Sequence, residues 1–218
     1  MTNNFDKICK YMSDLGIVET KEKADNSDLF FDVQLIRRGK DNPNLPSANY
    51  LFKVYYFDSI ELFSMFYKEI MTCCDLFRLR AYVSVNAKSK TEITHKTLKK
   101  YATNVLMNEY KKPWRAFNHI CSGMGGKEKR WVIDCDDTDR NSAYVKKLCQ
   151  VIELCKSEYD EQVIDIFDTN SGVHIITHPF NTYTFEKYCK TENIEIPGIK
   201  KNHITLLYEN LDYESNIS

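Results

Sequence analysis

Residues 130–137, RWVIDCDD, join a short apolar run to three carboxylates. The apolar part predicts a strand over 130–135, because branched residues suit the half-buried surface of a sheet. Side chains of a strand alternate between its two faces, so Asp134 and Asp136 share one face. Mg²⁺ is commonly held by one or two carboxylates together with substrate phosphates. The stretch therefore predicts a strand ending at a divalent-metal site, although acids at a strand end also serve as helix caps.

The sequence after this strand predicts a regular alternation of helices and strands. Apolar spacing indicates a strand at 162–168, another at 173–177 and a last one at 203–208, with helices at 141–156 and 182–191. This β-α-β-β-α-β order is that of the ferredoxin-like, RNA-recognition-type (RRM-like) arrangement. Its first and third strands lie side by side and antiparallel, so we expect the end of the first to meet the start of the third.

A histidine stands where the third predicted strand begins. Residues 170–176, NSGVHII, form a tight turn that leads His174 onto an apolar strand. The predicted topology places His174 beside Asp134 and Asp136, within reach of one bound substrate. The alternative is a histidine whose ring is packed and hydrogen-bonded in the core.

The two motifs VIDCDD and NSGVHII resemble those of the archaeo-eukaryotic primase superfamily, whose catalytic module has an RRM-like fold. The resemblance covers about residues 130–208. It implies that Asp134 and Asp136 bind Mg²⁺ or Mn²⁺ and are catalytic together with His174. It also implies that Ser171, Gly172 and His174 contact the phosphates of the incoming nucleotide. The spacing from Ser171 to His174 is one residue longer than the Ser-x-His of the family.

The third acidic position of that family has no clear counterpart in the sequence. Glu209 ends the last predicted strand, and seven residues at roughly 3.3 Å each would carry it about 20 Å from the site. Glu195 precedes that strand, so we assign it the third catalytic position. The same loop holds Lys200, Lys201 and His203, which we expect to bind the nucleotide by neutralising its triphosphate.

The first half of the chain predicts a mixed α/β module. Strands are expected at 29–37, 50–57 and 79–86, and helices at the N-terminus, from residue 60 to 74 and near 93–110. The predicted fold class is therefore α+β, with an N-terminal α/β module (1–129) packed on an RRM-like catalytic module (130–218). We expect these modules to form a single compact domain over 1–218.

The net charge of −1 conceals two regions of opposite sign. Residues 37–130 hold 18 Lys and Arg against eight Asp and Glu, whereas residues 131–218 hold eight against 16. A basic surface beside an acidic metal centre would suit single-stranded nucleic acid, although charge runs are often only solvated faces. The candidate nucleic-acid contacts are Arg37, Arg38, Arg78, Arg80, Lys88 and Lys90.

These features together predict a template-dependent nucleotidyltransferase that uses nucleoside triphosphates and a divalent metal. The resemblance implies a single-stranded template and a replicative helicase as partners. One alternative is a catalytically silent primase-fold protein that only binds nucleotide or nucleic acid. Another is a phosphoesterase that uses His174 and His203, although His174-Ile-Ile-Thr177 lacks the spacing of a paired two-histidine motif.

Composition indicates a cytoplasmic protein. No run approaches the roughly 20 apolar residues of a membrane span, and the N-terminus lacks the apolar core of a secretory signal. The eight cysteines form no CxxC pair, which is typical of reduced, buried thiols. The abundance of Lys, Asn, Ile and Tyr suggests an AT-rich genome, bacterial or viral; a phage protein would act in the host cytoplasm.

Overall fold

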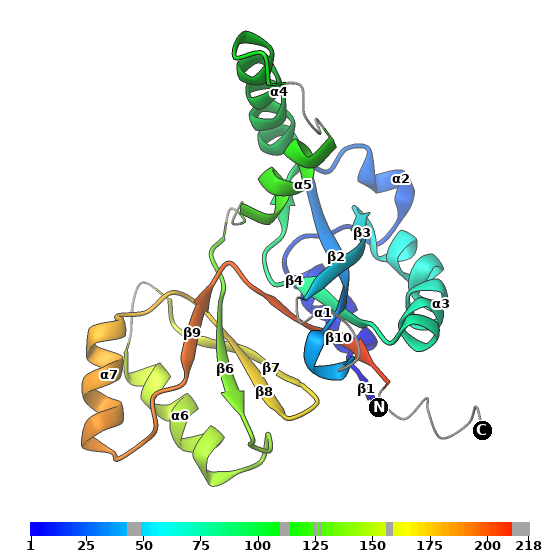
Figure 1. The fold of residues 1–218 in the computed structure, drawn as a ribbon. Helices are drawn as coiled ribbons and strands as arrows, with labels where there is room; N and C mark the ends of the chain where they lie inside the picture. The colour runs from blue at the N-terminus through cyan, green and yellow to red at the C-terminus, as the bar shows by residue number, and fades with distance from the viewer. Residues whose placement is uncertain (43–48, 110–113, 124–125, 127, 156–158, 211–218) are drawn as a thin grey trace, which may run out of the picture.

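The computed structural model describes residues 1–42, 49–109, 114–123, 126, 128–155 and 159–210 (Figure 1). Within these residues the protein is α+β, with seven α-helices and two antiparallel sheets of six and four strands. No helix in the described part is both long and apolar enough to cross a membrane.

The six-stranded sheet contains both ends of the described chain. Its order is β1-β10-β4-β2-β3, with β5 paired to β2. The strands are β1 (Thr2–Asn3), β2 (Leu29–Arg37), β3 (Tyr50–Phe57), β4 (Arg80–Ser84), β5 (Lys88–Ser89) and β10 (Ile204–Glu209). The predicted strands at 29–37 and 50–57 are confirmed, and the one at 79–86 is slightly shorter than expected.

Helices cover both faces of this sheet because β2 buries side chains on both sides. Phe31, Val33 and Leu35 pack with residues of α1 (Phe5–Asp14) and α3 (Ile60–Phe77). Phe30, on the opposite face, packs with residues of α4 (Lys90–Leu106) and α5 (Trp114–Gly123). The sequence predicted α1, α3 and α4 but not α5. The short α2 (Lys21–Ala24) and a 3₁₀ turn (Gly39–Asp41) complete this part.

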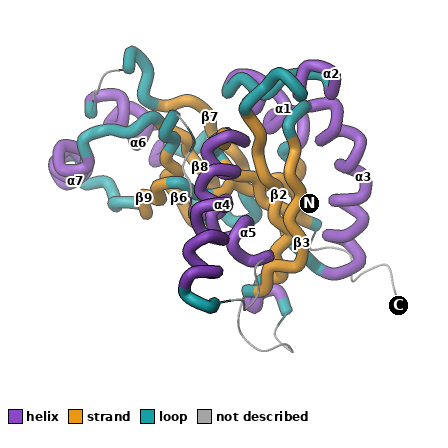
Figure 2. Tube along the Cα trace, turned by 90° about the horizontal axis from the view of Figure 1, so that it is seen from above, coloured by secondary structure: helices purple, strands orange, loops and turns teal. Residues whose placement is uncertain are grey.

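The four-stranded sheet has the order β7-β8-β6-β9. Its strands are β6 (Trp131–Asp136), β7 (Val163–Asp168), β8 (Gly172–Thr177) and β9 (Gly198–Lys201). Helices α6 (Ala143–Leu154) and α7 (Thr182–Thr191) bury Ile133, Cys135 and Ile175 on one face. Figure 2 shows α3 at one side of the molecule and α6 and α7 at the other, with both sheets between them.

The last predicted strand, at 203–208, exists but does not belong to the sheet in which we expected it. Residues 204–209 form β10, which pairs with β1 and β4 of the six-stranded sheet. The fourth place beside β6 is taken by β9, whose sequence GIKK has a single large apolar residue. Such a short, half-polar strand has no periodic signal, so only its pairing with β6 defines it.

The second face of the four-stranded sheet turns toward the six-stranded sheet. Val132, Phe167 and Ile176 belong to the same buried cluster as Leu207 of β10. The ring of Tyr11 in α1 meets Phe167 edge-on at 5.6 Å between centroids. Apolar contact holds the two sheets together here, and the ends of β6 and β8 carry polar side chains on the same face.

Candidate functional site

A cavity of about 320 Å³ lies between the two sheets. The four-stranded sheet contributes Asp134, Asp136, His174 and Lys200, and the turn before β8 adds Thr169, Asn170 and Ser171. The opposite wall comes from β2, β4, β10 and their flanking residues: Ile36, Arg38, Lys40, Asn49, Arg80, Tyr82, His203, Ile204 and Leu206. The cavity thus joins an acidic pair on one sheet to cations on both.

Asp134 is the most strongly held carboxylate of the cavity. Strands β6 and β8 are antiparallel neighbours, as predicted, and Asp134 stands directly opposite His174 in their register. One carboxylate oxygen lies 3.2 Å from His174 Nε2, and the other accepts a hydrogen bond from Lys200 Nζ. The bond to His174 and the Lys200 cation hold the pKa of Asp134 well below its usual range, against the opposing effect of burial. Asp134 is therefore ionised at neutral pH.

His174 connects the two sheets. Only 8% of the residue is exposed, and its Nδ1 lies 3.0 Å from the hydroxyl oxygen of Thr205 in β10. Its two ring nitrogens therefore both have protein partners, one on each sheet. The structure unites the two interpretations of His174, because the residue is buried and yet lines the cavity. Its contact with Thr205 holds the ring beside the Asp134 carboxylate.

Cations from the six-stranded sheet and its flanks face the two aspartates. Arg38 Nη1 donates to the Tyr82 hydroxyl at 2.8 Å, whereas Arg38 Nε is buried without a hydrogen-bond partner. Arg80 lies between Asp41, at 2.6 Å, and the buried Glu209, at 2.9 Å. Among the described residues, Asp134 and Asp136 line this cavity together with Arg80, which is already paired, and with the cations Arg38, Lys40 and Lys200, which suit it to an anionic ligand.

His203 is neutral at physiological pH. Burial, together with the nearby Lys200 cation, lowers its pKa to about 4. A neutral imidazole offers one donor and one acceptor to a ligand, whereas the neighbouring lysine offers charge.

The donor set fits a metal that is completed by its substrate. Asp134 and Asp136 lie two residues apart on the face that lines the cavity, and Asp136 is exposed. Within the described residues, no three His, Cys, Asp or Glu side chains gather closely enough to hold a metal ion by themselves. Mg²⁺ and Mn²⁺ accept such a sparse set when phosphate oxygens supply further ligands. Lys200, which bonds Asp134, would have to move to a phosphate.

Comparisons of the sequence with protein-family models and curated proteins, and of the structure with solved structures, find no match. The geometry and chemistry of the cavity are therefore the basis for the function proposed below.

Of the other site residues predicted from the sequence, some line the cavity and some lie away from it. Ser171 lines the cavity. Lys201 points away from it, because it follows Lys200 in a strand, and its ammonium lies over the Trp131 ring at 4.7 Å. Glu195 is exposed in the loop after α7, where its carbonyl accepts from the Tyr144 hydroxyl of α6, and it does not line the cavity. The structure thus gives no support for Glu195 as the third catalytic carboxylate.

The predicted nucleic-acid contacts are not one continuous surface. Lys88 is buried in an ion pair with Asp32, and Lys90 bonds Asp58 at 2.9 Å. Arg80 is 6% exposed and paired with two carboxylates, and Arg78 lies at the exposed end of α3. Arg37 is half-buried, and of these residues Arg38 and Arg80 line the cavity. Sequence clustering of charge therefore overstated the basic surface in this region.

The sequence did not place Lys40, Tyr82 or Thr205 beside the aspartates, from which all three lie far along the chain. Lys40 and Tyr82 line the cavity wall formed by the six-stranded sheet, and Thr205 bonds His174. Only the packing of the two sheets reveals them.

Gly172 allows the close approach of β8 to β6, and its replacement should destabilise the site. It pairs with Asp136, and an added Cβ would overlap the Cys135 carbonyl oxygen. We expect Gly172→Ala to lower the free energy of unfolding by about 1–3 kcal/mol, the typical cost of overpacking. Gly198→Ala is the matched control, because Gly198 pairs with Asp134 from the other side and has open space at its Cβ. Equal thermal stability of the two variants would contradict the role given to Gly172.

Proposed function

We propose that this protein is a divalent-metal-dependent nucleotidyltransferase of the primase-polymerase type, acting on nucleoside triphosphates in the cavity between its sheets. The observation that carries the proposal is the pairing of Asp134 with His174 across β6 and β8, with Asp136 two residues further along the same face. Cations on both cavity walls provide the complementary charge for a triphosphate.

The strand order supports the same proposal. The four-stranded sheet is formed in the chain order β6-α6-β7-β8-α7-β9 and has the spatial order β9-β6-β8-β7. We infer that this half of the protein is RRM-like, with its first and third strands adjacent at the centre. In this arrangement the two motifs that resemble the primase superfamily occupy the central pair of strands.

The side chains can divide the work of phosphoryl transfer between them. A bound divalent cation would neutralise developing charge on the phosphates and activate the attacking hydroxyl. Asp134 and Asp136 would hold it, and His174 would keep Asp134 ionised and correctly oriented. Arg38, Lys40 and Lys200 would position the triphosphate, since catalysis of this reaction depends mainly on positioning and electrostatics.

A second candidate function is nucleotide binding without transfer. Of the described residues that line the cavity, only Asp134 and Asp136 are carboxylates, and Lys200 already neutralises Asp134. A protein of this kind would bind triphosphate with little need for metal. Incorporation of a labelled nucleotide on a primed template with Mg²⁺ or Mn²⁺ distinguishes the two functions, because only a transferase extends the primer.

A two-histidine phosphoesterase is less well supported, since both ring nitrogens of His174 already have protein partners.

Lys200 and Lys201 form a matched pair for testing the nucleotide site. We expect Lys200→Met to weaken nucleotide binding about tenfold, the scale of a lost hydrogen bond to a charged group. The same change should strengthen Mn²⁺ binding, because it removes the cation that competes for Asp134. Lys201→Met should alter neither, since Lys201 lies over Trp131 on the other face. Calorimetric titration of both ligands measures these effects, and equal nucleotide affinity of the two variants would remove Lys200 from the site.

A further inference from the structure

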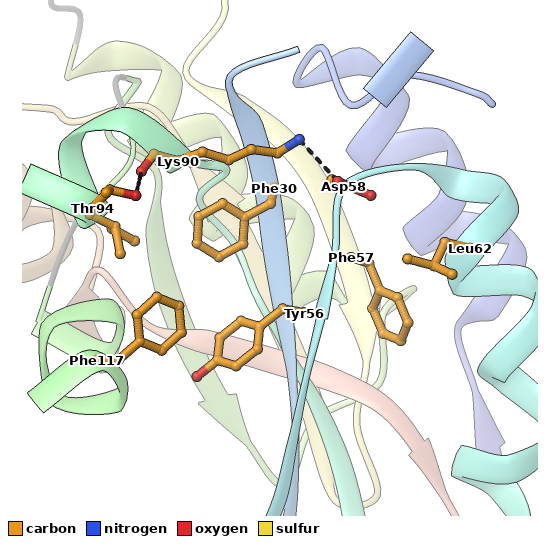
Figure 3. A pocket seen from close by; sticks show the side chains of 9 residues that line it. Phe30, Tyr56, Phe57, Asp58, Leu62, Lys90, Thr94 and Phe117 are labelled. Atoms are coloured by element: carbon orange, nitrogen blue, oxygen red, sulfur yellow. Dashed lines mark hydrogen bonds and ion pairs between the residues drawn. The ribbon is translucent and has the colours of Figure 1, made fainter. Parts of the chain in front are cut away.

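A second cavity, of about 340 Å³, lies on the N-terminal part of the protein between β2, β3, α3, α4 and α5. Figure 3 shows the rings of Phe30, Tyr56 and Phe117 around it, with the Lys90 side chain running across one end toward Asp58. Phe30 lies near the start of β2 and Arg38 directly follows its end, and eight extended residues correspond to roughly 26 Å. This aromatic pocket is thus separate from the cavity between the sheets.

The walls of the aromatic pocket present ring surface rather than polar atoms. Tyr56 meets Phe30 and Phe117 edge-on, with centroids 6.0 Å and 5.2 Å away. Its hydroxyl donates to Asn118 at 2.8 Å, so the ring and not the hydroxyl is offered to a ligand. The Thr94 hydroxyl likewise bonds the carbonyl oxygen of Lys90. A ligand in this pocket would therefore be bound mainly by contact of its flat apolar surface with these rings.

One end of the pocket is polar. Lys90 Nζ donates to Asp58 at 2.9 Å and to the Ala24 carbonyl at 2.8 Å. The ammonium is a donor with three protons and the carboxylate accepts through two oxygens, so the pair presents a donor and an acceptor side by side. Nucleobases match both features, since their faces stack on aromatic rings and their edges carry adjacent donors and acceptors.

We propose that the aromatic pocket binds one nucleobase, which lies against the rings of Phe30, Tyr56 and Phe117 that line the cavity and directs its polar edge to the Lys90–Asp58 pair. This base-binding site is additional to the proposed transfer reaction. Whether the aromatic pocket binds a base does not depend on whether the other cavity is catalytic. The base comes either from a free nucleoside or nucleotide or from a single strand, and these sources share the chemistry of recognition.

The test uses nucleosides, because they lack the phosphates that the cations of the other cavity would attract. Adenosine and cytidine are titrated into the full chain and followed by saturation-transfer NMR. Thr94→Trp should block the pocket from its exposed rim on α4 and weaken binding at least about tenfold, within the range typical of lost base stacking. Leu98→Trp is the matched control, since Leu98 is 60% exposed one turn further along α4 and does not line the pocket. Phe117→Ala provides a second variant that removes a stacking ring.

The comparison ligands decide what the pocket recognises. Indole should bind more weakly than the nucleosides, because it cannot satisfy both members of the Lys90–Asp58 pair. A ten-nucleotide single strand without a terminal triphosphate competes with adenosine if the base belongs to a strand, and fails to compete if the base is free. Absence of nucleoside binding, equal binding in Thr94→Trp and wild type, or indole binding as tight as that of the nucleosides would each overturn the assignment. The same nucleoside titrations of Asp134→Asn should give unchanged binding even if this variant has lost primer extension. A failure of the proposed transfer reaction is therefore distinguishable from a failure of the aromatic pocket.

Discussion

Replacement of both aspartates, Asp134→Asn with Asp136→Asn, is expected to reduce metal-dependent nucleotide transfer at least about 100-fold. The physical reason is loss of the charge that holds the metal and, through it, the triphosphate. The amide oxygen that remains is a much poorer ligand for a hard cation than a carboxylate. Primer extension with Mn²⁺ measures activity, and calorimetry measures the expected loss of Mn²⁺ binding.

The double variant needs a stability control because the two aspartates differ in their surroundings. Asp136 is exposed, whereas Asp134 holds both His174 and Lys200, so its loss should cost about 1–3 kcal/mol of unfolding free energy. Asp168→Asn, at the exposed end of the nearby strand β7, is the matched control and should retain full transfer. Unchanged transfer in a folded double variant would exclude the aspartates from the mechanism.

His174→Ala is expected to cost about 2–4 kcal/mol of stability, because it leaves a cavity between the sheets and removes a bond to each of them. For a chain of this length the melting temperature should fall by roughly 5–15 °C. Nucleotide affinity per folded molecule should fall as well, since Asp134 loses the partner that orients it. His174→Gln keeps a donor near Asp134 and should recover part of the affinity. A large stability loss with unaltered nucleotide affinity would identify His174 as purely structural.

The same variant should change the acid limb of the stability profile. The folded-state pKa of Asp134 is depressed chiefly by its bond to His174. Its stabilising contribution is therefore complete above the unfolded pKa of about 3.9 and is lost as the pH falls through the lower folded value. In His174→Ala the folded pKa moves toward the unfolded one, so less stability is lost below about pH 4. Unfolding by denaturant between pH 2 and 6 measures the difference, and parallel profiles would contradict the assigned pairing.

The sequence alone determined the strand that bears the aspartates and the partner that faces it. Alternation on 130–137 placed Asp134 and Asp136 on one face, and the expected adjacency of the first and third strands put His174 opposite Asp134, which the register confirms. These inferences held because side-chain alternation and short connections are local rules. The local rules did not predict α5 or the strand Gly198–Lys201.

The tertiary structure decided what surrounds the aspartates. The last strand pairs in the six-stranded sheet instead of the four-stranded one, and this pairing places Thr205 against His174. The tertiary structure also decided which cations can bind a ligand. Lys88 and Arg80 are buried in ion pairs that sequence spacing does not reveal. Contacts between residues distant in the chain depend on how two sheets pack, and no local pattern encodes that packing. The sequence determined the acidic face of the cavity and the nearby Lys200; the opposite wall, from the six-stranded sheet, is formed only when the two sheets pack.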